Sequence, residues 1–100
     1  MPARTGALLI TRSGRLYVYI VQCADGSYYT GYTKSLKSRL ALHNAGRGAK
    51  YVRGRRPVTL VYAKTYRGYR HAIRAERRVK QLTRRRKAAL ASAYHSRRRS

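Results

Sequence analysis

The first clear pattern along the chain is an alternation of side chains between residues 16 and 22. β-branched and aromatic residues that repeat at every second position are typical of a strand. Asp25-Gly26 follows as a strong hairpin-turn signal, and Tyr28 to Thr33 supplies a returning strand. The pattern therefore predicts a β-hairpin. One face of its first strand carries Leu16, Val18 and Ile20, and the other carries Tyr17, Tyr19 and Val21.

The length of the hairpin loop decides which tyrosines share a face. A two-residue loop of Asp25-Gly26 places Tyr29 opposite Gln22, on the face away from Tyr19. A three-residue loop that also contains Ser27 pairs Tyr29 with Cys23 and places it on the face of Tyr19. A slip of one residue exchanges the faces, so the residues alone leave both registers open.

Helical signals follow the hairpin. Thr33 or Ser35 can cap a helix that is expected to run to Asn44 and to end before Gly46. The stripe of this helix contains Leu36 and Leu40.

The second half of the chain predicts one strand and two further helices. Residues 47–56 form a basic, glycine-broken stretch that is expected to be a loop. Pro57–Ala63 is the expected third strand, because proline is tolerated at the first position of a strand. A helix is expected from near Tyr69 to about Leu82, and a third one from a cap at Thr83 to about residue 94.

These elements predict one α+β domain over residues 15–94, in the order β-β-α-β-α-α. Residues 1–14 are expected to be a flexible basic leader, and residues 95–100 a frayed basic tail. A chain of 100 residues is long enough to build one core.

Charge changes this picture most. The chain has 25 Lys and Arg residues against two acids, a formal net charge of +23. So much self-repulsion opposes a compact fold and favours a polyanionic partner, and nucleic acid is the obvious one. A basic surface that serves solubility alone is the alternative, but charges of mixed sign serve that purpose better.

Composition also narrows the classes of site and location. Cys23 is the only cysteine, so an intramolecular disulfide and zinc sites with two or more cysteines are excluded. A buried, inert thiol is expected. No apolar run approaches the roughly 18 residues of a membrane span, and Gly6–Ile10 is too short for a signal-peptide core. The acid-free start can mimic an organelle transit peptide, but a cytoplasmic, nucleoid-associated protein is the default expectation.

Glu76 is the only glutamate, and it falls within the inward stripe of the second predicted helix. A carboxylate on an inward face is costly unless it is paired or binds a metal. A salt bridge to an arginine at the edge of the core is the ordinary explanation. The scarcity of acids favours a metal, because Mg²⁺ often takes one or two protein carboxylates and completes its shell with water and phosphate. The stripe consists of Ala72, Ile73, Val79 and Leu82.

Arg39 and His43 lie four residues apart in the first predicted helix, so both project the same way. Arg39 can cover apolar surface with its stem or bind a phosphate with its guanidinium. A histidine alone is more often structural. Tyrosines start from a pKa of about 10, but a positive field and Arg39 favour the phenolate, so a tyrosine base is a candidate. By default the core or stacking tyrosines are Tyr17, Tyr19, Tyr28, Tyr29 and Tyr32.

Other catalytic arrangements are missing. The chain has no P-loop and no GxGxxG motif. Asp25 lies in the predicted turn, so an obvious second carboxylate for two-metal catalysis is lacking. Serine–histidine catalysis would need an acidic orienting residue that the chain hardly supplies.

Together these residues resemble the GIY-YIG nuclease superfamily, most closely its small stand-alone single-domain group, which also resembles the nuclease domain of the Slx-type endonucleases. Tyr17-Val18-Tyr19 stands at the first motif and Tyr29-Thr30-Gly31 at the second. Residues 43–51 and 55–58 resemble the small group in particular. The likeness covers about residues 16–90. Its further matching positions are Arg39, His43 and Glu76, with Val79, Lys80 and Leu82 on the glutamate helix.

The resemblance implies a one-metal phosphodiesterase built on a small three-stranded antiparallel sheet flanked by about three helices. Glu76 would hold the divalent cation, Mg²⁺ or Mn²⁺, and Arg39 would stabilise the phosphate. Tyr19 or Tyr29 would position or deprotonate the attacking water, with His43 close by. Because the family's two motif tyrosines share one site, the resemblance also predicts the odd-length hairpin loop.

The chain departs from the family pattern at two positions. Tyr17 stands where the first motif has its glycine, as is frequent in the small group, and Tyr32 stands where relatives frequently have lysine. No second DNA-binding domain and no RING-like zinc module is present in the sequence.

The favoured interpretation is a Mg²⁺-dependent endonuclease that acts on DNA, with branched and single-stranded forms and a role in DNA repair as candidates and RNA left open. A non-catalytic DNA- or RNA-binding module and a structural protein of a ribonucleoprotein are the rivals. The phosphate-binding surface would combine residues 47–56 with the helices after Tyr69. Nucleic-acid contacts are expected at Tyr17, Gly31, Tyr32, Asn44, Arg47, Lys50, Arg53, Arg55, Arg56 and Lys80.

Overall fold

The computed structural model describes residues 15–99, so the leader predicted for residues 1–14 lies outside the described residues. The fold is α+β, with an antiparallel sheet in the strand order β2-β1-β3, which confirms the predicted fold class. The strands are β1 (Arg15–Gln22), β2 (Tyr28–Thr33) and β3 (Thr59–Arg67). The helices are α2 (Leu36–Asn44), α3 (Lys50–Arg53), α4 (Tyr69–Lys80) and α5 (Arg84–Arg99).

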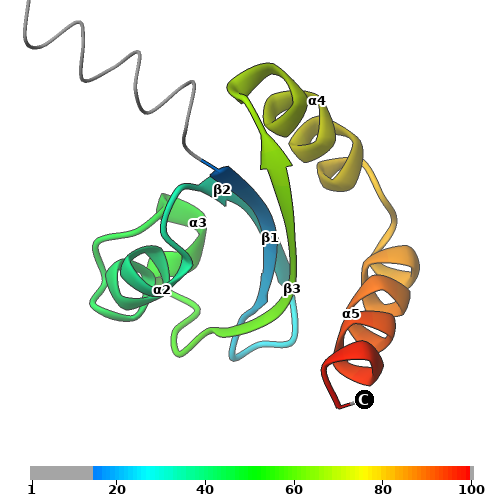
Figure 1. The fold of residues 1–100 in the computed structure, drawn as a ribbon. Helices are drawn as coiled ribbons and strands as arrows, with labels where there is room; N and C mark the ends of the chain where they lie inside the picture. The colour runs from blue at the N-terminus through cyan, green and yellow to red at the C-terminus, as the bar shows by residue number, and fades with distance from the viewer. Residues whose placement is uncertain (1–14, 100) are drawn as a thin grey trace, which may run out of the picture.

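The helices form two layers on opposite faces of the sheet (Figure 1). α2 and α3 cover one face, and α4 and α5 cover the other. β1 is the central strand, so its alternating side chains supply both cores. α4 also packs against the edge strand β2.

The core beneath α4 and α5 grows from Val18 and Ile20 of β1, both fully buried. Ala72, Ala75 and Val79 of α4 are buried against them. The two alanines place little side chain between helix and sheet, so α4 can lie close to the strands. Leu90 and Tyr94 of α5 pack against this core as partly buried residues.

The core beneath α2 and α3 uses the other face of β1. Tyr19, Val21 and Cys23 are buried there, so the thiol is in the environment predicted for it. Val52 of α3 is fully buried in the same cluster. Leu36 and Leu40 pack on it from α2, as the stripe of that helix predicted.

The hairpin has an odd-length loop, as the resemblance predicted, but its centre differs. Val21 pairs with Tyr29, so Tyr29 lies on the face of Tyr19. The predicted pairing of Tyr29 with Cys23 is wrong, because Cys23 instead accepts the amide of Gly26, 2.9 Å, and donates its own to Ser27 O, 2.8 Å. Because Cys23 faces Ser27, the turn is centred one residue earlier than predicted. Gly26 lies in this turn with φ +86°, a conformation that suits glycine.

Two predictions for the middle of the chain are corrected. Residues 47–56 are not all loop, because Lys50–Arg53 form the short helix α3, which buries Val52. β3 starts at Thr59 rather than Pro57 and continues to Arg67 rather than Ala63. Its extra length is paired with β1 up to the Arg15–Arg67 pair, a long-range contact that no local pattern indicates.

The helix ends differ in detail from the prediction. Ser35 is the cap of α2, and its side chain accepts the Ser38 amide, 3.3 Å. α4 ends at Lys80, two residues before the predicted end. α5 continues to Arg99, so the backbone after residue 94 is helical where a frayed tail was expected. Within α4 Ala75 is buried, whereas Ile73 is only half-buried. In the described part of the chain no helix is long and apolar enough to cross a membrane.

Candidate active site

A small pocket lies at the edge strand β2, where the two helical layers meet. Its volume is about 220 Å³. α2 contributes a residue from one face of the sheet, and α4 contributes one from the other. The structure thus brings together four of the five residues predicted to be catalytic. The lining residues are Tyr19, Tyr29, Gly31, Tyr32, Arg39 and Glu76.

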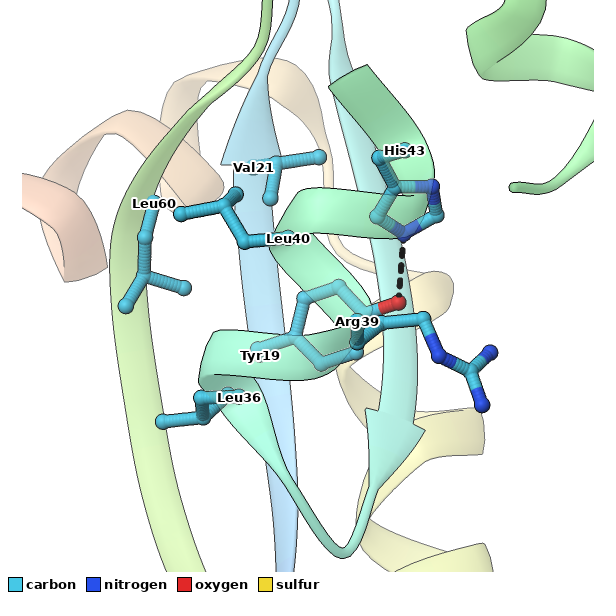
Figure 2. Close-up of a pocket in the computed structure, with 7 residues that line it drawn as sticks. All are labelled: Tyr19, Val21, Leu36, Arg39, Leu40, His43 and Leu60. Atoms are coloured by element: carbon cyan, nitrogen blue, oxygen red, sulfur yellow. Dashed lines mark hydrogen bonds between the residues drawn. The ribbon is translucent and has the colours of Figure 1, made fainter. Parts of the chain in front are cut away.

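The fifth predicted residue, His43, is hydrogen-bonded to Tyr19. The Tyr19 hydroxyl lies 2.8 Å from His43 Nε2, and both side chains are buried. Figure 2 shows this bond next to α2. The Arg39 guanidinium points away from the apolar side chains of the labelled valine and leucines. Tyr29 contacts the His43 ring edge-on, with ring centroids 5.5 Å apart. The two motif tyrosines and the histidine therefore form one cluster of rings.

Burial sets the protonation of this pair. It raises the pKa of Tyr19, with a smaller contribution in the same direction from Tyr29, and Arg39 only partly opposes the rise. Burial likewise lowers the pKa of His43, and the nearby cation of Arg39 lowers it further. At neutral pH both groups are therefore neutral. The expectation that the positive field favours the phenolate is wrong for Tyr19, because desolvation outweighs Arg39.

Two glycines make room for this pair. Gly31 lies opposite Tyr19 in the sheet, and a Cβ atom there would stand 2.7 Å from the Tyr19 hydroxyl. Gly48 leaves room for the other ring nitrogen of His43: a Cβ atom at Gly48 would overlap His43 Nδ1. That nitrogen is buried and has no hydrogen-bond partner among the described residues. Gly31 was predicted to contact nucleic acid, which stays a prediction; the structure places it against Tyr19 and in the lining of the pocket.

Glu76 is mostly buried, with 14% of its side chain exposed, and it faces the pocket from α4. The ordinary explanation expected an arginine partner. The partner is Lys80, one turn further along α4, with Nζ 3.5 Å from Glu76 Oε2 and 54% of its side chain exposed. An ion pair with so exposed a lysine contributes little stability.

The donor set fits a cation that prefers oxygen ligands, such as Mg²⁺ or Mn²⁺, rather than zinc or copper. Within residues 15–99 no group of three or more His, Cys, Asp and Glu side chains could hold a metal. Glu76 is the single carboxylate at the pocket, which has room for coordinating water. That arrangement suits Mg²⁺, which keeps much of its water shell. Asp25, as predicted, is elsewhere: it pairs with Arg55 at the hairpin turn, 3.1 Å.

Tyr51 is a site residue that the sequence did not reveal. Its ring stacks on Tyr29, with centroids 6.2 Å apart and an angle of 21° between the planes. The Arg55 guanidinium carbon lies 3.9 Å from the centre of the Tyr51 ring on α3. The only signal in the sequence was that Tyr51 ends a segment that resembles the small group. Nothing in that segment indicated its contact with Tyr29.

Tyr69 is a second site residue that the sequence did not reveal. Its hydroxyl lies 3.5 Å from the Tyr32 hydroxyl, and the two rings meet at 78°. This contact raises the pKa of Tyr32, with a smaller contribution from burial. Tyr69 is the first residue of α4, so its position depends on how α4 packs against β2.

Most of the other predicted nucleic-acid contacts lie outside the pocket. Asn44 binds the backbone before β3, where its Oδ1 accepts the Val58 amide, 2.7 Å, and its Nδ2 donates to Val58 O, 3.2 Å. Arg53 Nε donates to Gly48 O, 3.1 Å, and Arg56 Nε donates to Arg53 O, 2.9 Å. These groups hold the α3 segment together. Arg47 and Lys50 are exposed nearby, and Tyr17 is half-buried in β1.

Comparisons with known proteins show which sequences the chain resembles. A family model described as the GIY-YIG catalytic domain matches residues 15–89. A UPF0213 protein of Halobacterium salinarum is 53% identical over 74 residues, which are 74% of this chain and 96% of that protein. A UPF0213 protein of Staphylococcus haemolyticus is 51% identical over 71 residues, which are 71% of this chain and 87% of that protein.

Two solution NMR structures are similar as well. That of a UPF0213 protein from Bacillus halodurans has a TM-score of 0.51 and 47% identity, and covers 79% of this chain and 84% of that one. That of a protein from E. faecalis has a TM-score of 0.56 and 36% identity, and covers 85% of this chain and 91% of that one. None of these four names states an activity, a metal or a substrate.

Proposed function

The chain belongs to the GIY-YIG catalytic domain family, a family of nucleases, and we propose that it hydrolyses phosphodiester bonds in DNA at the pocket beside β2. One observation carries the proposal. Tyr19, which is hydrogen-bonded to His43, lines the same pocket as a guanidinium and the chain's only glutamate. A proton acceptor, a phosphate-binding cation and a metal ligand are the groups that phosphodiester hydrolysis needs.

The Tyr19–His43 pair provides a path for the proton of the attacking water. With the His43 proton on Nδ1, the Tyr19 hydroxyl donates to Nε2, 2.8 Å away. The raised pKa of Tyr19 keeps the free phenolate scarce, and the lowered pKa of His43 keeps the imidazole neutral, with the Nε2 lone pair available. We infer that Tyr19 takes the water proton as its own proton passes to His43 Nε2. Tyr29, packed against both rings, positions the water.

Arg39 is the residue for the scissile phosphate. It is half-buried at the pocket wall, and its guanidinium can donate two parallel hydrogen bonds to phosphate oxygens. Charge develops on those oxygens in the transition state, so a fixed cation there lowers the barrier. A lysine, with a single compact ammonium, would not reproduce the two bonds.

Glu76 would hold the divalent cation, Mg²⁺ or Mn²⁺. When bound, such an ion polarises the phosphate and neutralises charge on the leaving oxygen. The burial of Glu76 keeps its carboxylate in one place, and its only ion-pair partner among the described residues, Lys80, is an exposed side chain that can move aside.

A second candidate function is the binding of nucleic acid without cleavage. The Glu76–Lys80 ion pair favours it, because this pair gives the glutamate a partner without any metal. The net charge of +23 alone would serve such a protein.

The deciding experiment compares wild type, Glu76→Gln and Asp25→Asn, which neutralise the only two acids in turn. Asp25 lies outside the pocket, so Asp25→Asn is the matched control for lost negative charge. Cleavage of branched, single-stranded and duplex DNA is measured with Mg²⁺, with Mn²⁺ and with EDTA at a fixed salt concentration, and binding by fluorescence anisotropy. We expect cutting by wild type and Asp25→Asn that needs metal and is lost in Glu76→Gln, with binding retained. Equal binding and no cutting by all three proteins would establish the second candidate.

A further inference from the structure

A second, larger pocket adjoins the candidate active site. Its volume is about 450 Å³, and it shares Tyr32 and Arg39 with the pocket that contains Glu76. It lies between the start of α2 and the start of α4, and neither the family resemblance nor the mechanism above gives it a role. Pockets of this size that join apolar walls to a few polar groups are typical of ligand sites.

The walls of this pocket are unusually apolar for the surface of so basic a chain. Leu42 is 40% exposed and Tyr69 is 52% exposed, and both line it. Within the described residues only three large hydrophobic side chains are this exposed, and the third, Tyr51, is already stacked on Tyr29. Two such side chains on the walls of one pocket make it a candidate binding surface.

The shape of the walls favours a flat ligand. Tyr32 and Tyr69 meet nearly at right angles, with centroids 5.9 Å apart, so each ring cannot cover the face of the other fully. The hydroxyls are 3.5 Å apart, at the outer limit of a hydrogen bond, so the edge-on packing of the rings is what orients the two side chains relative to each other. A planar ring can stack on such an aromatic face with little loss of side-chain entropy, because the face is already held in place.

The charges at the rim favour an anion attached to that flat ligand. Lys34 is exposed at the pocket, and Arg39 stands on the wall that the pocket shares with the candidate active site. No acidic side chain lines the pocket. A planar apolar ring next to a phosphate is the chemistry of a nucleotide.

We propose that this second pocket, the base pocket, takes up one nucleobase of the substrate strand, unstacked from its neighbours and next to the phosphate at Arg39. The proposal rests on the proposed function, because that function identifies the substrate strand as DNA. Taking a base out of a duplex requires unstacking, so the base pocket favours sites where a base is already unpaired. Leu42 and Tyr69 would thereby select the form of the substrate, although neither touches the reacting phosphate.

The test uses two DNA duplexes that differ only at one extra, unpaired nucleotide. In one duplex this nucleotide carries adenine, and in the other it is an abasic analogue, so only one unpaired base is available and the binding register is fixed. Binding is measured by anisotropy in EDTA with Glu76→Ala protein. Cleavage is then absent, so the anisotropy reports binding to the base pocket alone. Cleavage by wild type with Mg²⁺ tests the proposed function separately, so a failure of one proposal can be told from a failure of the other.

We expect the adenine bulge to bind about 5- to 150-fold more tightly than the abasic bulge, the range of base–aromatic stacking. When Leu42→Ala and Tyr69→Ala are both added to the Glu76→Ala protein, this preference should be abolished. Tyr69→Phe, which keeps the ring, should retain the preference. Equal binding of the two bulges by the parent protein would overturn the proposal, because the protein would then contact the backbone alone. A preference that survives Leu42→Ala and Tyr69→Ala would overturn it too, because the base would then bind elsewhere. Circular dichroism checks that these exposed substitutions leave the fold intact.

Discussion

Gly31 and Tyr19 face each other across the β1–β2 ladder, and the phenol of Tyr19 occupies the space where a side chain at Gly31 would stand. A Cβ atom at Gly31 would lie 2.7 Å from the hydroxyl oxygen and 2.9 Å from Cζ. The ring cannot move away freely, because it is buried and its hydroxyl is bonded to His43. The glycine of the second family motif thus has a steric reason in this chain.

Gly31→Ala should therefore displace Tyr19. We expect a loss of about 1–3 kcal/mol in the free energy of unfolding, as for other overpacked cores, measured by urea denaturation. Cleavage should fall with it. Gly54→Ala is the matched control, since nothing lies within 4 Å of a Cβ atom there and its φ is −93°. Equal stability of wild type and Gly31→Ala would contradict the steric account.

Tyr19→Phe tests the proton path. The substitution keeps the ring and removes the hydroxyl, so His43 Nε2 is left buried without its partner. We expect cleavage to fall about 10²- to 10⁴-fold, the usual contribution of general base catalysis, with DNA binding unchanged. Stability should fall by about 1–3 kcal/mol. Tyr29→Phe is the comparison, and a greater loss of cleavage there than in Tyr19→Phe would make Tyr29 the base.

The sequence predicted the parts of this site that lie on regular elements. Local periodicity placed Arg39 and His43 together on α2 and Glu76 on the inward face of α4. The residues left the hairpin register open, and the family resemblance predicted that Tyr19 and Tyr29 share a face and that all five residues meet. The structure gathers these side chains as expected, although their catalytic roles stay predictions.

What the sequence missed depends on long-range contacts. Tyr51 reaches Tyr29 only because Val52 anchors α3 in the core, and a glycine-broken basic stretch gave no sign of that helix. Gly48 packs against His43 through the same segment. The hairpin centre was misplaced by one residue, since Asp25-Gly26 indicates a turn without fixing which residue stands at its centre.

Lowering the pH should destabilise the protein through His43. Burial and Arg39 lower the folded-state pKa of His43 below its ordinary value of 6.5, so the unfolded chain binds more protons between the two values. Stability then rises with pH through this window and is lost as the pH falls from above 6.5 through the folded-state pKa. Urea denaturation between about pH 8 and about pH 5 measures the slope.

His43→Gln is the control for that slope. Without the imidazole, the pH dependence of the free energy of unfolding in this window should become shallower. Parallel slopes for wild type and His43→Gln would show that other groups cause the effect.

Tyr51→Ala tests whether the stack on Tyr29 supports the site. We expect a modest loss of stability, about 0.5–1.5 kcal/mol, because one ring pair is removed from a half-exposed position. The turnover rate should fall more than the affinity for DNA, since Tyr29 loses the ring that holds it. Tyr51→Phe keeps the stack and should behave as wild type. A fall in affinity alone, measured by anisotropy, would instead make Tyr51 a contact to the nucleic acid.

Lys80→Gln tests whether Glu76 is a metal ligand or only half of an ion pair. The Lys80 ammonium, 3.5 Å from Glu76 Oε2, competes with a cation for the carboxylate. Without it, Mn²⁺ should bind about 2- to 5-fold more tightly, as expected for the loss of an exposed ion pair, measured by electron paramagnetic resonance without DNA. Arg78→Gln is the matched control, because Arg78 is another exposed cation on α4 and has no ion pair with Glu76.

The two explanations of Glu76 then give opposite results. If Glu76 holds a metal, Lys80→Gln binds Mn²⁺ more tightly than wild type and Arg78→Gln, and Glu76→Gln binds none. If Glu76 serves only the ion pair, no variant binds Mn²⁺, and Lys80→Gln leaves a mostly buried carboxylate without a partner. That unpaired carboxylate would lower the free energy of unfolding relative to wild type, measured by urea denaturation. Mn²⁺ affinity and the free energy of unfolding together decide which role this glutamate has.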